Sequence, residues 1–181
     1  MRHIEDPVNL SPEEFELAVK GILDAGAGQL VNYESQHLHE LCAADGEYTI
    51  DVSARFEALG ANFLVLVECK HHKRKIERQD VQVLHSKLQS LGAQKAMLFS
   101  TSGFQAGAIE FADSHGIALV HIVAGSSCWV TRSADQPTSA PPWLDLPAYI
   151  GWWCSGASRS VMSEDYTKYT REALGLPPSE P

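Results

Sequence analysis

The chain has 181 residues, of which 44% are hydrophobic and 20% charged, and its formal net charge at pH 7 is −9. This length allows one domain with a substantial core plus an additional segment, and the acidic balance excludes a protein coated in basic surface. Because every apolar run is shorter than the ~20 residues that cross a bilayer, and the N-terminal residues lack the apolar core of a signal peptide, we expect a cytoplasmic protein without membrane association.

The first predicted element is a helix that begins after Ser11. Ser11 suits the N-cap, Pro12 suits the first helical position, and Glu14 completes a capping box three residues after the cap. The apolar face of this helix is predicted to consist of Phe15, Val19, Ile22 and Leu23, and Gly26 and Gly28 are predicted to end it.

Two strands separated by a loop are predicted next. We expect a short strand over residues 29–35 and a loop over residues 36–46, where the pattern is irregular. His37 and His39 share a parity that would suit a metal pair in an extended segment, but no third ligand is evident. Residues 48–56 alternate cleanly, with Ile50, Val52, Ala54 and Phe56 facing inward and Thr49, Asp51, Ser53 and Arg55 facing the other way.

Residues 63–70 are predicted to form a central strand, because both of their faces are apolar until the strand ends. Side chains alternate between the faces of a strand, so Glu68 and Lys70 project from the same side and Cys69 from the other. An acid and a base at this point are costly to bury unless they meet a partner, a metal or solvent. The alternative is a strand that has simply reached the surface.

The connection between these two strands indicates which residues face each other. The Gly-containing segment 57–62 favours an antiparallel hairpin, and a turn centred between Leu59 and Gly60 places Asp51 opposite Glu68. Cross-strand neighbours have β-carbons roughly 4.5–5.5 Å apart, where like charges are destabilising. Two facing carboxylates therefore favour a divalent cation site, and Mg²⁺ suits a site with one or two carboxylates.

The second half of the core alternates helices and strands. An amphipathic helix is predicted over residues 77–91, a buried strand over 96–100, a helix over 103–115 capped by Ser102, and an apolar strand over 117–122. This order implies parallel strands joined by right-handed crossovers. The sheet is therefore predicted to be mixed, antiparallel at its start and parallel at its end.

Basic residues are concentrated between Lys70 and Arg78, next to the predicted site. Such a patch could contact phosphates in a salt-sensitive manner, and it could equally be a solvated loop and helix start. The cysteines are too scattered for a zinc site or a disulfide framework, so we expect reduced structural thiols at Cys42, Cys69, Cys128 and Cys154.

The composition changes near residue 125, which we take as the boundary between a core domain, residues 1–125, and a C-terminal extension, residues 126–181. Residues 133–147 are rich in Ser, Pro and Ala and indicate a linker, and a helix is predicted over 163–174. Trp143, Tyr149, Trp152 and Trp153 could stack on bases, contact a partner or pack over the core. We favour packing or partner contact, because basic residues are sparse there.

Together these motifs resemble the PD-(D/E)XK nuclease superfamily and, within it, the Mrr-like restriction endonuclease catalytic domain. The resemblance covers about residues 12–123. It is based on Asp51, on Glu68-Cys69-Lys70 and on a helix with Gln82. It also includes the Phe-Ser-Thr-Ser-Gly-Phe segment 99–104, which leads into a helix with Ala108 and Ala112. One departure is that only Gly46 represents the glycine-rich run that often precedes the first acid.

The resemblance implies a three-layer α/β fold, αβββαβαβ, with a mixed central sheet flanked by helices. It implies that Asp51 and Glu68, with the Cys69 backbone carbonyl, hold one or two Mg²⁺ ions, which Mn²⁺ could replace. Lys70 would orient or help deprotonate the attacking water and offset negative charge. Gln82 and Glu16 are the residues that match supporting positions in the family, and for both the alternative is an ordinary exposed helix residue.

The implied function is a Mg²⁺-dependent endonuclease that hydrolyses phosphodiester bonds in DNA, in restriction or other defence. Two alternatives remain: a structure-selective nuclease that resembles a junction resolvase, and a catalytically silent module that binds nucleic acid or a partner protein. No winged-helix or zinc-finger pattern is present, so a separate targeting subunit is one expectation. A homodimer is another, because a cut across both strands would usually need two active sites.

Overall fold

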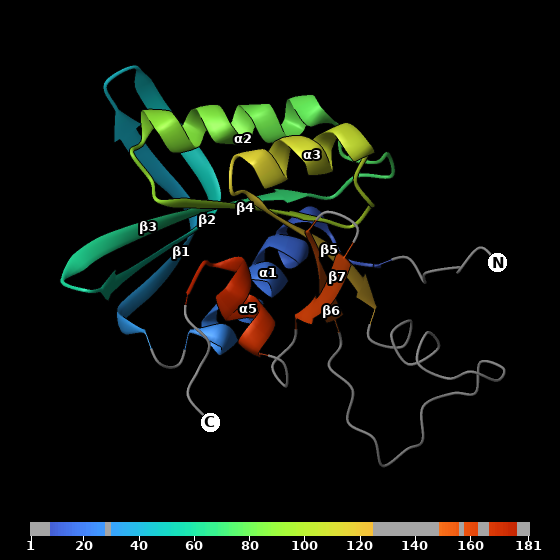
Figure 1. The fold of residues 1–181 in the computed structure, drawn as a ribbon, viewed down its shortest axis with the longest axis horizontal. Helices are drawn as coiled ribbons and strands as arrows, with labels where there is room; N and C mark the ends of the chain where they lie inside the picture. The colour runs from blue at the N-terminus through green and yellow to red at the C-terminus, as the bar shows by residue number, and fades with distance from the viewer. Residues whose placement is uncertain (1–7, 28–29, 125–148, 156–157, 163–166, 177–181) are drawn as a thin grey trace, which may run out of the picture.

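The computed structural model describes residues 8–27, 30–124, 149–155, 158–162 and 167–176. Within them, a seven-stranded mixed sheet runs in chain order from β1 to β7. In Figure 1, α2 and α3 cover one face of this sheet, and α1 and α5 lie on the other, so the fold has three layers. No helix in the described part of the chain is long and apolar enough to cross a membrane.

Helix α1 (Pro12–Gly26) begins as its sequence predicts. The Glu14 amide donates to Ser11 Oγ at 3.2 Å, and the Ser11 amide donates to Glu14 Oε2 at 2.8 Å, which completes the capping box. The helix ends at Gly26, and Gly28 lies outside the described residues. Of the predicted apolar face, Phe15, Val19 and Leu23 are buried, whereas Ile22 is only partly buried.

Strand β1 (Val31–Ala43) corrects the prediction of a loop over residues 36–46. The strand lies at one edge of the sheet, and its residues alternate between exposed and half-buried, so polar side chains occupy both faces. Its conformation therefore comes from antiparallel pairing with β2 (Gly46–Ala58) rather than from an apolar pattern. A positive φ of 49° at Leu38 interrupts the regular strand opposite the β2 residue Asp51.

The hairpin between β2 and β3 (Ala61–Lys70) has the predicted register. Ala58 pairs with Ala61 and Val52 pairs with Val67, on either side of a turn at Leu59 and Gly60. Both turn residues have positive φ, 51° and 76°, as a two-residue turn of type I′ requires. The ladder ends at the Val52–Val67 pair, one step before Asp51 and Glu68, so the direct Asp51–Glu68 pairing stays a prediction.

The parallel half of the sheet also follows the prediction. Helix α2 (Arg78–Ser90) connects β3 to β4 (Lys95–Ser100), and α3 (Ala106–Ser114) connects β4 to β5 (Ala118–Ala124). The start of α3 is a correction, because its N-cap is Gln105 and not Ser102. The Ser102 hydroxyl instead donates to the Arg74 carbonyl at 2.5 Å, which ties the loop after β3 to the turn after β4.

The C-terminal residues continue the sheet, which the sequence pattern did not predict. Strand β6 (Tyr149–Ser155) pairs antiparallel with β5, and β7 (Ser158–Met162) pairs with β6. Helix α5 (Thr167–Ala173) lies within the helix predicted over residues 163–174. Trp153 packs against the core on the α1 side of the sheet, and Trp152 packs against Val123 and Ile150. Cys128, Trp143 and the predicted linker 133–147 lie outside the described residues.

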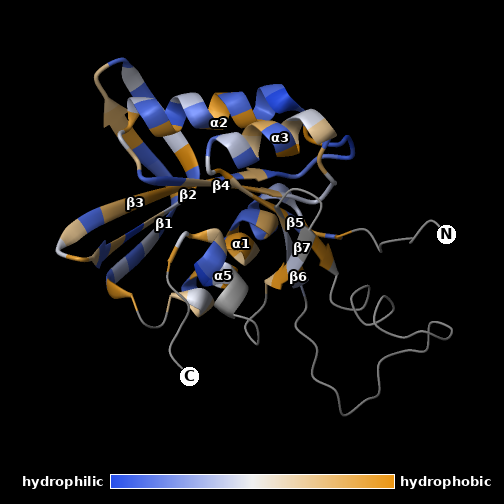
Figure 2. Ribbon diagram, in the orientation of Figure 1, coloured by the Kyte–Doolittle hydropathy of each residue, from blue (hydrophilic) through white to orange (hydrophobic). Residues whose placement is uncertain are grey.

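The sheet separates two apolar clusters. One lies under α1 and includes Val52, Val67 and Phe99, and the other lies under α2 and α3 and includes Leu66 and Leu98. In Figure 2 the middle strands are coloured as hydrophobic, whereas the helices alternate hydrophobic and hydrophilic residues. Strand β3 is therefore buried on both faces, and its charged end has to find partners within the fold.

Two glycines of α1 provide a test of how α5 packs. A β-carbon at Gly26 would lie 2.6 Å from Thr170 Cγ2 of α5, whereas one at Gly21 would meet nothing within 4 Å. We expect Gly26→Ala to lower the free energy of unfolding by about 1–3 kcal/mol through overpacking. Gly21→Ala should raise it by roughly 0.5–1 kcal/mol, because alanine favours a helix interior. Urea unfolding of both variants measures the difference, and equal stabilities would contradict the packing of α5 on α1.

Candidate active site

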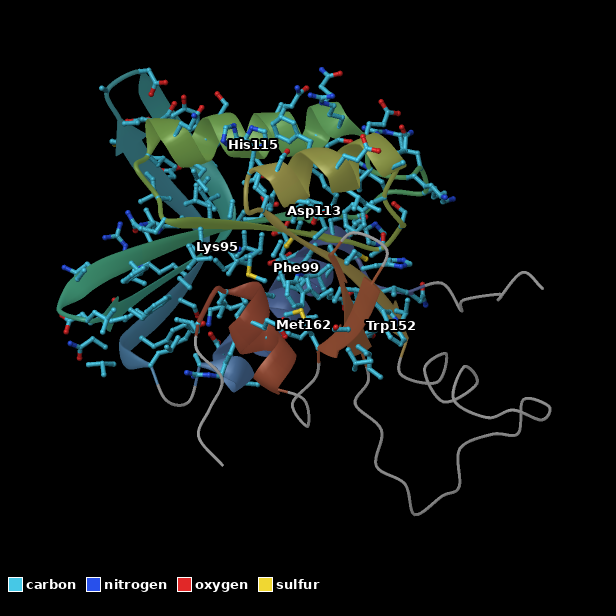
Figure 3. All side chains as sticks on the ribbon, in the orientation of Figure 1. Lys95, Phe99, Asp113, His115, Trp152 and Met162 are labelled. Carbon is cyan, nitrogen blue, oxygen red and sulfur yellow. The ribbon has the colours of Figure 1, made fainter. Side chains whose placement is uncertain are left out.

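The predicted site residues lie around the carboxyl end of β3. Asp51 comes from β2, Glu68 and Lys70 come from β3, and Glu16 comes from the first turns of α1. Cys69, between Glu68 and Lys70, pairs with Phe99 of the neighbouring strand β4. Figure 3 labels Phe99 near the middle of the molecule, between the two helix layers. The candidate site therefore lies next to a central strand of the sheet and not on an isolated surface strand.

Asp51 lies where the β2–β3 ladder ends. Its Oδ2 accepts a hydrogen bond from the Cys69 amide at 2.7 Å, so the side chain takes the place of the next backbone partner. Burial raises the pKa of Asp51, and the negative charges of Glu68 and Glu16 raise it further, although the Cys69 amide and Lys70 act in the opposite direction. The ionised Asp51 carboxylate is therefore under electrostatic strain, which a bound cation would relieve.

Glu68 is 8% exposed, and each of its carboxylate oxygens faces a lysine. Lys70 Nζ donates to Oε1 at 2.7 Å, and Lys87 Nζ, from α2, donates to Oε2 at 2.9 Å. Burial alone would raise the pKa of Glu68, but the two lysines hold it below its ordinary value. Burial likewise opposes the charge of Lys70, yet the hydrogen bond and charge of Glu68 raise the pKa of Lys70. Both groups are thus ionised at neutral pH.

The Cys69 thiol is not a nucleophile at this site. Burial raises the pKa of the thiol well above its ordinary value, and the charges of Asp51, Glu16 and Glu68 raise it further. A thiol rather than a thiolate is therefore present at neutral pH, and the thiolate is the reactive and metal-binding form. The backbone carbonyl remains the group through which Cys69 could bind a metal, as the sequence analysis expects.

Glu16 is held in place by a histidine of the edge strand. Its Oε2 lies 2.7 Å from His37 Nε2, and both side chains are 18% exposed. His39 instead contacts Ser53 Oγ through Nδ1 at 2.7 Å, so the two histidines bind different partners and do not form a pair. Among the described residues, no three His, Cys, Asp or Glu side chains are close enough together to hold a metal ion.

Gln82 does not reach this cluster, and another residue of α2 does. Gln82 is exposed on α2, and its side chain makes no hydrogen bond with any described residue. Lys87, which the sequence analysis did not single out, contacts Glu68 directly. The helical period could have indicated this. Val81 and Leu84 form the apolar stripe of α2, and Lys87 lies on one side of that stripe whereas Gln82 lies on the other.

Glu68 and Lys70 also line a hollow of about 210 Å³ beside the first turns of α2. Arg74 in its wall forms a two-pronged ion pair with Asp80, at 3.1 and 3.2 Å. The other lining residues are Glu77, Gln79 and Val83. A small charged group could enter here and meet the Lys70 ammonium, which makes the cluster accessible from solvent.

The chain matches the Mrr_cat family, described as restriction endonuclease, over residues 8–124, which is more than half of its length. The chain therefore belongs to the Mrr-type restriction endonuclease family, and its core is a nuclease domain. This finding confirms the resemblance and the three-layer mixed α/β fold drawn from the sequence. No curated protein matches the chain significantly.

Two solved structures are similar in part. A crystal structure of a protein of unknown function, AF1548, is 19% identical with a TM-score of 0.48, and covers 59% of this chain and 55% of its own. The DNA modification-dependent restriction endonuclease AspBHI is 17% identical with a TM-score of 0.43, and covers 60% of this chain and 28% of its own. Both scores are below 0.5, so the family match alone supports the assignment.

The strain on Asp51 predicts an unusual effect on stability. In EDTA at pH 7, we expect Asp51→Asn to raise the melting temperature, because the raised pKa means that the ionised carboxylate is disfavoured in the folded state. Asparagine can still accept the hydrogen bond from the Cys69 amide. Differential scanning calorimetry measures the change.

Asp24→Asn is the matched control. Burial opposes the charge of Asp24, but Lys20, Ser35 and Tyr33 lower its pKa, so the ionised form is favoured and this variant should melt at a lower temperature than wild type. A fall for both variants would contradict the electrostatic account of Asp51.

Proposed function

We propose that the protein is a Mg²⁺-dependent DNA endonuclease of the restriction type, with Asp51, Glu68 and Lys70 as its catalytic residues. One observation carries the proposal: in a chain of the restriction endonuclease family, the Glu68–Lys70 pair lies next to the Asp51 carboxylate at the solvent-accessible end of a buried strand. Placing one buried and two partly buried charged groups where two core strands end is costly, and catalysis would explain why the fold retains them.

The residues present suit Mg²⁺. This ion usually binds through one or two carboxylates and keeps several waters, which agrees with a site formed by Asp51 and Glu68. The effect of Glu68 and Glu16 on the pKa of Asp51 is the repulsion that a divalent cation relieves. We assign the Cys69 carbonyl as a further ligand and Glu16 as an outer acidic group. The ion, or Mn²⁺ in its place, would lower the pKa of a bound water and stabilise negative charge on the phosphate.

Lys70 is assigned the positive charge beside the reacting phosphate. Its ammonium is half-buried, hydrogen-bonded to Glu68 and exposed to the hollow. Because its raised pKa keeps it protonated, it can donate a hydrogen bond to the attacking water or to a phosphate oxygen, and it offsets the charge that develops there. This supports the orienting and charge-balancing role over that of a general base.

A lysine substitution tests this assignment. We expect Lys70→Ala to reduce cleavage by at least about 100-fold, the typical loss on removing a group that stabilises developing charge. The matched control is Lys20→Ala, which removes a lysine of α1 that pairs with Asp24 at 2.7 Å instead of with a site residue, and it should leave the rate unchanged. Circular dichroism checks that both variants fold.

The choice of substrates separates the proposed activity from the alternatives. Supercoiled plasmid, linear duplex, four-way junction DNA and single-stranded RNA are each incubated with Mg²⁺. Cleavage of branched DNA alone would favour a structure-selective nuclease. A Lys70→Ala variant as fast as wild type would refute the role of Lys70. Linear product formed without a nicked intermediate would favour a homodimer, whereas a requirement for added extract would favour a separate targeting subunit.

We also propose that the loop after β3 contacts the phosphates of the DNA backbone. Residues 71–75 continue directly from Lys70 and are held by the turn after β4, through the Thr101 amide to the Lys70 carbonyl at 3.2 Å and through Ser102. Arg74 is engaged with Asp80, whereas Lys73 and Lys75 are exposed and make no ion pair with any described residue. Two lysines in a fixed loop beside the site are suited to contact phosphates.

The salt dependence of binding tests this loop. We expect Lys73→Ala/Lys75→Ala to weaken the binding of duplex DNA and to reduce the slope of log K against log salt by about 2, one for each lost phosphate contact. Fluorescence anisotropy in Ca²⁺, where cleavage does not interfere, measures the slope. Lys20→Ala is again the control and should keep the wild-type slope. An unchanged slope in the double variant would exclude these lysines from the interface.

A further inference from the structure

Lys87 differs from Lys20, the lysine of helix α1. It lies in the third turn of α2, its side chain is only 19% exposed, and it reaches across to the sheet to meet Glu68 Oε2 at 2.9 Å. By comparison, Lys20 pairs with Asp24 within α1, one helical turn away. A pair between two residues of one exposed helix face adds little, whereas Lys87 connects two layers of the fold.

Both acid-bearing strands come within reach of this ammonium. Besides Glu68 on β3, Lys87 Nζ lies 3.5 Å from the Thr49 carbonyl on β2, two residues before Asp51. The tip of the β1–β2 hairpin is fastened to the same helix, because Ser90 Oγ donates to Asp45 Oδ2 at 2.7 Å, and the Tyr48 hydroxyl lies 3.0 Å from Asp45 Oδ2 and 3.3 Å from Ser90 Oγ. The β1–β2 hairpin and Lys87 thus fix the end of α2 against the strands that bear the carboxylates.

A charge count at the centre shows what Lys87 contributes. Asp51 and Glu68 carry two negative charges, and Lys70 and Lys87 carry two positive charges, so the inner cluster is neutral without a metal ion. This count covers those four groups only: Asp80 is paired with Arg74, and Glu16 lies outside them with its Oε2 2.7 Å from His37 Nε2. One divalent cation would then match the two negative charges of a phosphodiester under attack by hydroxide. Without Lys87, the same cation would leave one negative charge unbalanced.

We propose that Lys87 is a positioning residue of the active site. It holds one oxygen of Glu68 and supplies the positive charge that a second metal ion supplies in two-metal nucleases, so that each site uses a single divalent ion. The inference rests on the proposed function, because it requires Asp51 and Glu68 to bind the metal. It deepens that function by fixing the number of ions and by replacing Gln82 with Lys87 as the residue of α2 that supports the site.

The test counts metal ions directly, without DNA. Electron paramagnetic resonance of Mn²⁺ titrated into the protein gives the number bound, for wild type, Lys87→Met, Lys87→Gln and Lys20→Met. We expect one ion per chain in wild type and in Lys20→Met. Lys87→Met and Lys87→Gln should both bind a second ion or lose metal affinity by about 10- to 100-fold, as changes beside a metal ligand typically do. Glutamine keeps a hydrogen bond to Glu68 without the charge.

Cleavage adds a second measurement. We expect the two uncharged variants to show a Mg²⁺ dependence steeper than wild type, with a Hill coefficient rising towards about 2 as a second ion replaces the lost charge. Lys87→Arg should keep the wild-type Hill coefficient, because it keeps the charge.

Three outcomes would overturn the inference. Two ions bound by wild type would do so without any variant, even if the Lys87 variants failed to fold. Uncharged variants with the affinity, ion number and Mg²⁺ dependence of wild type would also do so. Wild type that binds no Mn²⁺ would refute the proposed function itself, and the inference with it. The first two outcomes leave metal binding by wild type intact and therefore refute the inference alone.

Discussion

The candidate site depends on one buried carboxylate, that of Glu68. At 8% exposure it cannot be solvated by bulk water, so its charge has to be balanced inside the fold. Lys70 comes from the same strand and Lys87 from the helix above it, so the balance requires β3 and α2 to keep their relative position. The apolar contacts of Val81 and Leu84 under α2 maintain that position. The charge balance of Glu68 therefore depends on the apolar packing of α2 against the sheet.

A short turn determines where Asp51 lies relative to Glu68. Leu59 and Gly60 both adopt positive φ, and this two-residue turn fixes the pairing of β2 with β3 from Ala58–Ala61 to Val52–Val67. A slip of one residue would move every side chain of β2 to the opposite face. The apolar residues Val52 and Val67 resist that slip, because they would leave the core. The geometry of the candidate site thus depends on a turn that lies roughly 25 Å of strand length away.

The parts of the fold that the sequence predicts well are those where local chemistry and packing agree. The capping box of α1, the hairpin register and the parallel half of the sheet all belong to this group. Strand β1 and strands β6 and β7 were not predicted, because an edge strand with polar residues on both faces has no clear period, and aromatic strands in a polar context are ambiguous. Pairing with a neighbour, which sequence alone does not reveal, decides these cases.

The site shows the same division. Asp51, Glu68 and Lys70 follow from alternation along two strands, and the structure brings them together. Gln82 was predicted from the family resemblance, and it is exposed, whereas Lys87 reaches the site. The backbone of a strand alone determines which side chains share a face. Whether a lysine of a helix contacts the sheet depends on the distance between helix and sheet and on the rotation of the helix about its axis. Such distances arise only when the layers pack.

The acidic charge of the whole chain bears on how such a site would meet DNA. A net charge of −9 repels a phosphate backbone at long range, but this repulsion is screened beyond roughly 10 Å at 0.1 M salt. Attraction from Lys70 and the exposed lysines of the loop after β3 acts within that range. A surface of this kind favours DNA only when it is already close, so it gives weak non-specific binding and little sliding. If the protein cuts DNA as proposed, its selectivity therefore has to come from contacts at the site, from a second copy of the chain, or from a targeting partner that brings the DNA within reach.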